Sequence, residues 1–146
     1  MISKLADLSA RQGDLLRSHR VGHPQWYAEN LVCVALSGRL MPTNCKDYDI
    51  ETPEYGRVQV KCRVDGTDTS YDHNRTNFKK YKPNAFDWAA IVIFTPGYRI
   101  DGAKLIRLVD LRPLVMAAGH VKWKAVREHT NARCIRDHLR LIAGEV

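Results

Sequence analysis

The chain has 146 residues, of which 45% are hydrophobic, and its 23 Lys and Arg against 16 Asp and Glu give a net charge of +7. This length suits one domain spanning residues 1–146, because such a chain can bury roughly two-thirds of its unfolded surface. No apolar run approaches the roughly 18 residues of a membrane span, and the N-terminal segment has charges where a secretory signal is apolar. We therefore expect an intracellular, cytoplasmic protein without membrane association, and the positive charge favours a polyanionic partner.

The cysteines do not form a metal-binding or redox pattern. No two of them have the two-residue spacing of zinc knuckles or redox pairs. They are Cys33, Cys45, Cys62 and Cys134. We interpret them as reduced and mostly buried thiols, with a disulfide as the alternative.

Two helices are predicted in the first 38 residues. Residues 2–17 place four leucines near helical spacing, which predicts one or two turns packed on a neighbour. A second helix is predicted from Pro24, a favourable residue for a first turn, and Gly38 is placed to stop it. Its single acid, Glu29, lies in a stretch otherwise nearly free of charge. The apolar residues at helical intervals are Trp26, Tyr27, Leu31, Val34, Ala35 and Leu36.

A hairpin is predicted next. Residues 45–51 and 57–64 alternate as half-buried strands do, and the turn 52–56 between them makes them antiparallel neighbours. The first strand carries the acids Asp47, Asp49 and Glu51. The second divides into an apolar face of Val58, Val60 and Cys62 and a polar face of Arg57, Gln59, Lys61 and Arg63. This geometry brings the acids near Gln59 and Lys61.

The remainder predicts a mixed α/β layer with a largely continuous sheet. Residues 65–84 read as a long polar surface loop, of the length seen when a loop has a function. Residues 88–94 are the most apolar run of the chain and predict a central strand buried on both faces. Another strand is predicted at 103–109, and helices at 111–118 and 131–142.

The acids of the hairpin indicate a metal site. Magnesium prefers hard oxygen ligands and needs only one or two carboxylates together with backbone carbonyls and waters. Asp49 is the most central acid of its strand and therefore the natural first ligand. A lysine beside such a metal can orient the attacking water and offset charge on a phosphate, and Lys61 shares the face of Gln59.

These residues carry a resemblance to a known family. Asp49, nine residues and then Gln59-Val60-Lys61, preceded by Glu29 on a helix, resembles the PD-(D/E)XK nuclease superfamily in its Gln-X-Lys variant. That superfamily includes many restriction enzymes, Holliday-junction resolvases and a few intron-encoded homing endonucleases. The resemblance implies an α/β, restriction-endonuclease-like fold with an αβββαβ core, in which a mixed central sheet is flanked by helices.

The resemblance also implies a role for each residue. Asp49 would bind the divalent metal, and Gln59 stands where a second acid usually lies. Lys61 would assist the water, and Glu29 would be the accessory acid of the helix. We expect Mg²⁺, with Mn²⁺ as an alternative, on Asp49, Gln59 and the backbone carbonyl of Val60. Cleavage of a duplex further implies a homodimer or higher homo-oligomer.

Each site residue has a structural alternative. Gln59 and Lys61 could be the solvated face of an edge strand, and Glu29 could pair with an arginine on the helix surface. The cluster at residues 78–82, FKKYK, could contact phosphates and stack on bases, or it could be an exposed loop anchored by its two aromatic residues. Trp123, between two lysines, could be a packing residue or a nucleic-acid contact. The predicted nucleic-acid contacts are Arg57, Arg63, Arg75, Lys79, Lys80 and Lys82.

The sequence therefore favours a divalent-metal-dependent DNA endonuclease that hydrolyses phosphodiester bonds. The main alternative is a non-catalytic nucleic-acid-binding protein that retains the nuclease fold. An enzyme acting on a small anionic substrate is a weaker third reading, because no glycine-rich phosphate loop or nucleophile motif is present.

Overall fold

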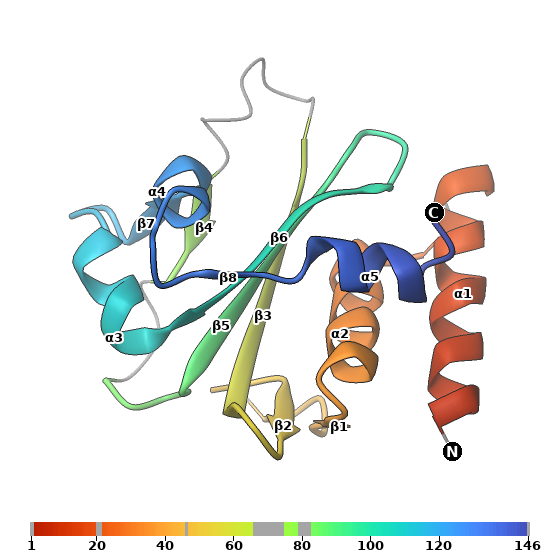
Figure 1. Ribbon diagram of the computed structural model, residues 1–146, viewed down its shortest axis with the longest axis horizontal. Helices are drawn as coiled ribbons and strands as arrows, with labels where there is room; N and C mark the ends of the chain where they lie inside the picture. Colours follow the sequence, from red (N-terminus) through yellow and green to blue (C-terminus); the bar gives the residue numbers. More distant parts are fainter. Residues whose placement is uncertain (1, 20–21, 46, 66–74, 79–82, 146) are drawn as a thin grey trace.

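The computed structural model describes residues 2–19, 22–45, 47–65, 75–78 and 83–145. Its helices are α1 (Ile2–His19), α2 (Pro24–Ala35), α3 (Leu108–Leu111), α4 (Trp123–Arg127) and α5 (Arg136–Ile142), with a 3₁₀ turn η2 at Arg112–Leu114. Its strands are β1 (Arg39–Leu40), β2 (Ile50–Thr52), β3 (Gly56–Val64), β4 (Arg75–Asn77), β5 (Trp88–Phe94), β6 (Ile100–Arg107), β7 (His120–Lys122) and β8 (Arg133–Cys134). The chain is therefore a mixed α/β protein, as predicted (Figure 1).

Six strands form one mixed sheet in the order β1-β2-β3-β5-β6-β8, and β4 and β7 form a separate two-stranded ribbon. The predicted hairpin is confirmed, because β2 and β3 are antiparallel with Ile50 opposite Val58. β3 and β5 are parallel, so the chain crosses over between them. After β5 a short turn leads into β6, which pairs antiparallel with β5. The sheet thus places β3 between a very short strand and the central strand β5.

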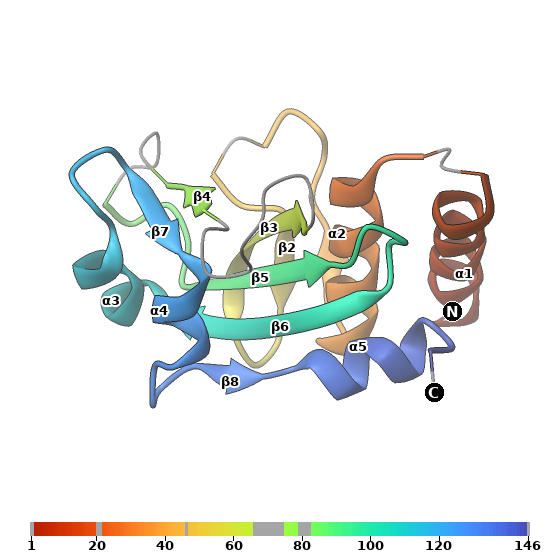
Figure 2. The same ribbon diagram turned by 90° about the horizontal axis from the view of Figure 1, so that it is seen from above.

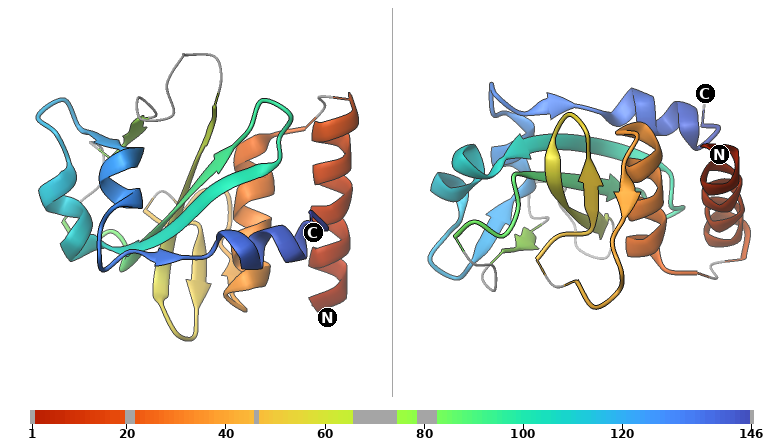
Figure 3. Two further views of the ribbon diagram at one scale, coloured as in Figure 1. Left: turned by 45° about the horizontal axis from the view of Figure 1, so that its top comes forward. Right: turned by 90° about the horizontal axis from the view of Figure 1, so that it is seen from below.

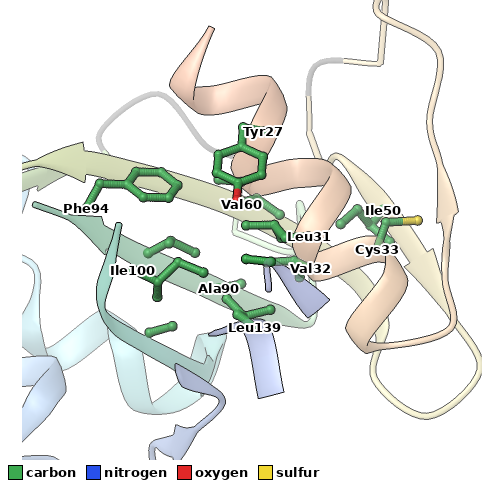
Figure 4. Close-up of a cluster of buried hydrophobic side chains, with 14 of the residues drawn as sticks. Tyr27, Leu31, Val32, Cys33, Ile50, Val60, Ala90, Phe94, Ile100 and Leu139 are labelled. Atoms are coloured by element: carbon green, nitrogen blue, oxygen red, sulfur yellow. The ribbon is translucent and has the colours of Figure 1, made fainter. Parts of the chain in front are cut away.

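Two hydrophobic clusters cover the two faces of the sheet. On one face, β3 and β5 contribute Val58, Val60, Ala90 and Val92 to a cluster with α2 and α5 (Figure 4). The alternate residues of β5, Ala89, Ile91 and Ile93, pack on the other face against Phe78, Leu111, Val121 and Trp123. Figure 2 shows α2 and α5 at one end of the sheet and α3, α4 and β7 at the other. The central strand is therefore buried on both faces, as its apolar sequence predicts.

Helix α2 lies between the sheet and α1 (Figure 1). The close approach of the two helices needs a glycine, because a Cβ at Gly13 would lie 2.6 Å from the hydroxyl oxygen of Tyr27. Tyr27 is fully buried and stacks on Phe94 with ring centroids 5.6 Å apart. Asn30 is buried on the same side and donates a hydrogen bond to Gln12 of α1. Helix α2 is thus fixed from both sides, which positions its one acid.

Both N-terminal helices lie where the sequence predicts them, but α1 is longer than the one or two turns predicted, because it runs without a break from Ile2 to His19. Pro24 is at the first turn of α2, and the helix ends at Ala35, ahead of Gly38. Trp26, however, was predicted with the apolar set and is 57% exposed. Its neighbour Tyr27 takes the buried position because one residue of helix turns a side chain by about 100°.

The predicted strand 45–51 is wrong in extent, since only Ile50 to Thr52 form β2. Asp49 still donates its backbone N–H to the carbonyl of Val58 at 3.0 Å and accepts from Met41 at 2.9 Å. Asp47 and Tyr48 precede the hydrogen bonds of Asp49 and lie outside the strand. The alternation of residues 45–49 therefore does not reflect a pleated strand, because the chain leaves the sheet there.

The C-terminal third also differs from prediction. The strand predicted at 103–109 occupies residues 100–107, and the helix predicted at 111–118 is replaced by α3, which ends at Leu111, and the 3₁₀ turn. Pro113 lies in that turn and cannot continue an α-helix. In place of a helix over 131–142, β8 pairs with the edge of β6 and α5 begins only at Arg136. Strand β4 lies inside the segment predicted as a loop.

Within the described residues, none of the helices combines the length and the apolar character that crossing a membrane demands.

Candidate metal-binding site

The candidate site lies where the two strands of the hairpin separate (Figure 3). β2 pairs with β3 only from Gly56 to Val58, whereas β3 continues to Val64. The backbone N–H of Val60 therefore faces an edge without a strand partner on that side. The carboxylate of Asp49 accepts this N–H, with Oδ2 2.8 Å from the nitrogen. An aspartate at this position satisfies a donor that would otherwise be unpaired, and its charge is fixed beside β3.

Gln59 also binds the same carboxylate. Its Nε2 donates to Oδ2 of Asp49 at 2.8 Å and lies 3.3 Å from the carbonyl oxygen of Val60. Gln59 is only 5% exposed, so it is not the solvated face of an edge strand. The structure thus places the predicted pair in direct contact, with Asp49 just before β2 and Gln59 in β3.

Helix α2 brings a second carboxylate and a second amide to the same point. Nε2 of Gln25 donates to the Val60 carbonyl at 2.7 Å and to Oε1 of Glu29 at 3.0 Å. Gln25 and Glu29 are one helical turn apart, so both side chains leave α2 on the same face. Glu29 therefore points toward β3, and it forms no ion pair with an arginine among the residues that the structure describes.

The carboxyl groups of Glu29 and Asp49 are close enough to repel each other when both are ionised. Burial raises the pKa of Glu29 above its ordinary value, and the hydrogen bond from Gln25 lowers it. The neighbouring Asp49 raises the pKa of Glu29 further, both through its charge and through hydrogen bonding between the two carboxyl groups. Two carboxylates held together in a half-buried position are unfavourable unless a proton or a cation lies between them. We call Glu29, Asp49 and the Val60 carbonyl the oxygen cluster.

The oxygen cluster has the chemistry of a magnesium or manganese site. It offers two carboxylates and a backbone carbonyl, which are hard oxygen donors of the kind that magnesium prefers. No group of three or more His, Cys, Asp or Glu side chains that could hold a metal occurs in the described part of the chain. These residues fit the metal that the sequence implies.

The sequence predicts Gln59 as a metal ligand, and the structure shows the hydrogen bonds that its amide group makes. In the observed orientation its amide nitrogen, a hydrogen-bond donor, faces Asp49 and the Val60 carbonyl. Its oxygen would become a metal ligand only if the amide turned over. Gln25 was not among the predicted site residues, although a glutamine one turn before Glu29 was a signal available in the sequence.

Lys61 extends from the same face of β3 as Gln59. The residue is partly buried, and its Nζ lies 6.0 Å from the centroid of the Phe78 ring. That face also carries the second hydrophobic cluster, to which Phe78 belongs.

The predicted nucleic-acid contacts fall in different surroundings. Arg57 donates its backbone N–H to Asp87 at 2.8 Å and forms an ion pair with the same carboxylate at 3.3 Å, so its charge is neutralised within the fold. Arg63 is exposed and lines a hollow beside the N-terminus of α2. Arg75 lies in β4, with its side chain outside the described set. Lys79, Lys80 and Lys82 lie outside the described residues.

Several other interpretations are resolved. Glu51 forms an exposed ion pair with Arg39 at 2.9 Å and does not join the oxygen cluster. Phe78 is 7% exposed beside Phe86, so this residue of FKKYK is an anchor in the core. Trp123 is 2% exposed and is a packing residue. All four cysteines are free thiols, of which one, Cys134, is exposed.

The chain matches no known protein-family model, and no curated protein resembles it in sequence.

Proposed function

We propose that the chain is a divalent-metal-dependent DNA endonuclease with a restriction-endonuclease-like core. The observation that supports this best is the oxygen cluster, in which Glu29 of α2 and Asp49 before β2 converge on the Val60 carbonyl of β3. The layout is that of the resemblance, with a helix acid, an aspartate at the hairpin and a Gln-X-Lys strand. The net charge of +7 suits a polyanionic substrate.

The residues of the site would divide the work of hydrolysis. Glu29, Asp49 and the Val60 carbonyl would hold Mg²⁺, which when bound supplies Lewis acidity toward a phosphate and its attacking water. Lys61, two residues beyond Gln59 on the same face, would orient that water and offset charge that develops on the phosphate. Gln25 and Gln59 hold the oxygens in place through their amide groups. Cleavage of both strands of a duplex would require two copies of the site, hence a homodimer or higher assembly.

One observation favours the alternative of a non-catalytic nucleic-acid-binding protein. Both amide nitrogens, from Gln25 and Gln59, lie within hydrogen-bond distance of the Val60 carbonyl, where a metal ion would bind. Neutral donors that already satisfy these oxygens reduce the attraction for a cation. In this alternative the protein retains the nuclease fold, but the side-chain amides of Gln25 and Gln59 take the place of a metal ion at the Val60 carbonyl.

A cleavage assay distinguishes the endonuclease from the non-catalytic nucleic-acid-binding protein. Purified protein is incubated with plasmid and branched DNA in Mg²⁺, Mn²⁺ or chelator, beside Asp49→Asn and Lys61→Ala. Asparagine retains an oxygen that can accept from Val60 N–H, so loss of cleavage in Asp49→Asn reports the lost charge. The matched control is Glu51→Gln, which removes a hairpin acid outside the oxygen cluster. Metal-dependent cleavage lost in both site variants but not in the control supports the enzyme; unchanged DNA binding without cleavage supports the alternative.

A further inference from the structure

An exposed tryptophan lies next to the oxygen cluster. Trp26 is 57% exposed, whereas Trp123 is 2% exposed and Trp88 packs edge-on against Tyr55. Exposing most of an indole to water forgoes the stabilisation that its burial would give. Single exposed apolar residues are common on protein surfaces, so the position of Trp26 must decide whether it has a function.

Helix geometry places the indole beside the candidate site. Trp26 follows Gln25 and precedes Glu29 by three residues, so its side chain is rotated about 60° from that of Glu29 around the axis of α2. Residues three apart on a helix have Cβ atoms about 5–6 Å from each other. A group stacked on the indole would therefore lie close to a phosphate bound by a metal ion at the oxygen cluster.

The surroundings of Trp26 suit a nucleotide. The imidazole of His23 stacks on the indole, with ring centroids 4.9 Å apart and an angle of 23° between the planes. His23 also lines a hollow of about 390 Å³, together with Gln25, Cys62 and Arg63. Gln25 belongs both to this hollow and to the oxygen cluster. The hollow therefore reaches from His23, the ring that stacks on Trp26, to Gln25 of the candidate site, and Arg63 lies on its wall.

This combination recognises single-stranded nucleic acid. Aromatic side chains that project from a basic surface stack on successive bases with little regard to sequence, and arginines contact the backbone. An indole can stack only on a base whose face is free, and in a duplex both faces are covered by neighbouring base pairs. We propose that Trp26, supported by His23, is a stacking site for an unpaired base of the substrate strand. A phosphate of the same strand would be bound by a metal ion held at the oxygen cluster, and Arg63 would contact the backbone from the wall of the adjoining hollow.

This inference names a substrate class, DNA with an unpaired segment beside the cleaved bond, and in that respect rests on the proposed function. Binding can be tested without cleavage. In chelator, oligothymidylate and a duplex of equal length are titrated into the full chain, and both intrinsic tryptophan fluorescence and affinity are measured. The variants are Trp26→Ala and Trp26→Phe, with Leu8→Ala as the control, since Leu8 is another exposed apolar helix residue at 48% exposure.

The expected result is specific to the single strand. Oligothymidylate should quench the fluorescence of the wild type, and Trp26→Ala should weaken its binding about 5- to 150-fold, the range for loss of one stacked base. Trp26→Phe should retain most of the affinity, and duplex binding should change less than twofold. Equal losses for single strand and duplex, no loss in Trp26→Ala, or no binding of oligothymidylate by the wild type would each overturn the inference.

The test separates this inference from the proposed function. Metal-dependent cleavage by a chain whose Trp26→Ala variant binds oligothymidylate normally would refute the stacking site alone. Stacking at Trp26 in a chain that cleaves no DNA with any metal would refute the nuclease and leave the stacking site.

Discussion

Replacing Glu29 with glutamine should stabilise the metal-free protein while abolishing its response to metal. The substitution Glu29→Gln removes one of two opposed carboxylates and keeps the shape of the side chain. Its amide oxygen can still accept the hydrogen bond from Gln25, which is 3.0 Å long in the wild type. The repulsion between positions 29 and 49 is therefore removed without loss of packing.

The size of the effect follows from charge and burial. Two unit charges about 4 Å apart interact by about 4 kcal/mol at an effective dielectric constant of 20. Glu29 is only half-buried and can relieve the repulsion by taking up a proton, so we expect a gain of about 1–2 kcal/mol in the free energy of unfolding.

The gain should depend on pH. The folded chain holds the Glu29 proton to a higher pH than the unfolded chain, because burial and Asp49 raise the pKa of Glu29. Wild-type stability should therefore fall as the pH rises from the ordinary pKa of a glutamate through the raised value. The difference between variant and wild type should be absent below that window and complete above it.

The assay is urea denaturation of wild type and Glu29→Gln on both sides of this window, with chelator and with Mg²⁺. At a metal concentration about 100 times its dissociation constant, the wild type should gain about 2.7 kcal/mol, and the variant much less. The order of stability should then reverse between the two conditions. A variant less stable than wild type above the window without metal, together with a wild type that Mg²⁺ does not stabilise, would refute the opposed-carboxylate reasoning.

Three further predictions test other parts of the structure. Gln25→Leu, which removes a donor that orients Glu29, should lower metal-dependent cleavage about 10- to 100-fold with an unchanged circular dichroism spectrum, and normal cleavage would contradict its orienting role. At pH 8 a disulfide reagent should modify the exposed Cys134 rapidly and the partly buried Cys62 much more slowly, because burial raises the pKa of Cys62 to about 12; equal rates would contradict the raised pKa. Gly13→Ala should cost about 1–3 kcal/mol in urea denaturation because its methyl group would overlap Tyr27, and an unchanged midpoint would show that α1 shifts freely.

Part of the candidate site could be predicted because it depends on short-range pattern. The alternation of residues 57–64 put Gln59 and Lys61 on one face of a strand, and the turn before it made the hairpin antiparallel. The sequence then predicted Asp49, Gln59 and the Val60 carbonyl as metal ligands, with Glu29 as the accessory acid. Glu29 comes near Asp49 and the Val60 carbonyl because α2 packs against β3, and this packing cannot be read from a local pattern.

Other features depend on contacts that no local pattern encodes. The donor role of Gln25 follows from a hydrogen bond to a carbonyl 35 positions away in the chain. The exposure of Trp26 follows from which side of α2 meets the sheet and which meets α1. The short extent of β2 follows from the separation of the hairpin strands at Asp49.

The sequence by itself determined the elements with strong periodicity, namely the two N-terminal helices, β3 and the buried strand β5. Their side chains repeat with the geometry of the backbone, so a window of several residues is sufficient to identify them. Tertiary structure alone decided the edges: β8 joins β6 where a helix was predicted, and Asp49 turns its carboxylate onto the free N–H of Val60. An unpaired backbone group takes the nearest available partner, and which partner is near depends on the whole fold.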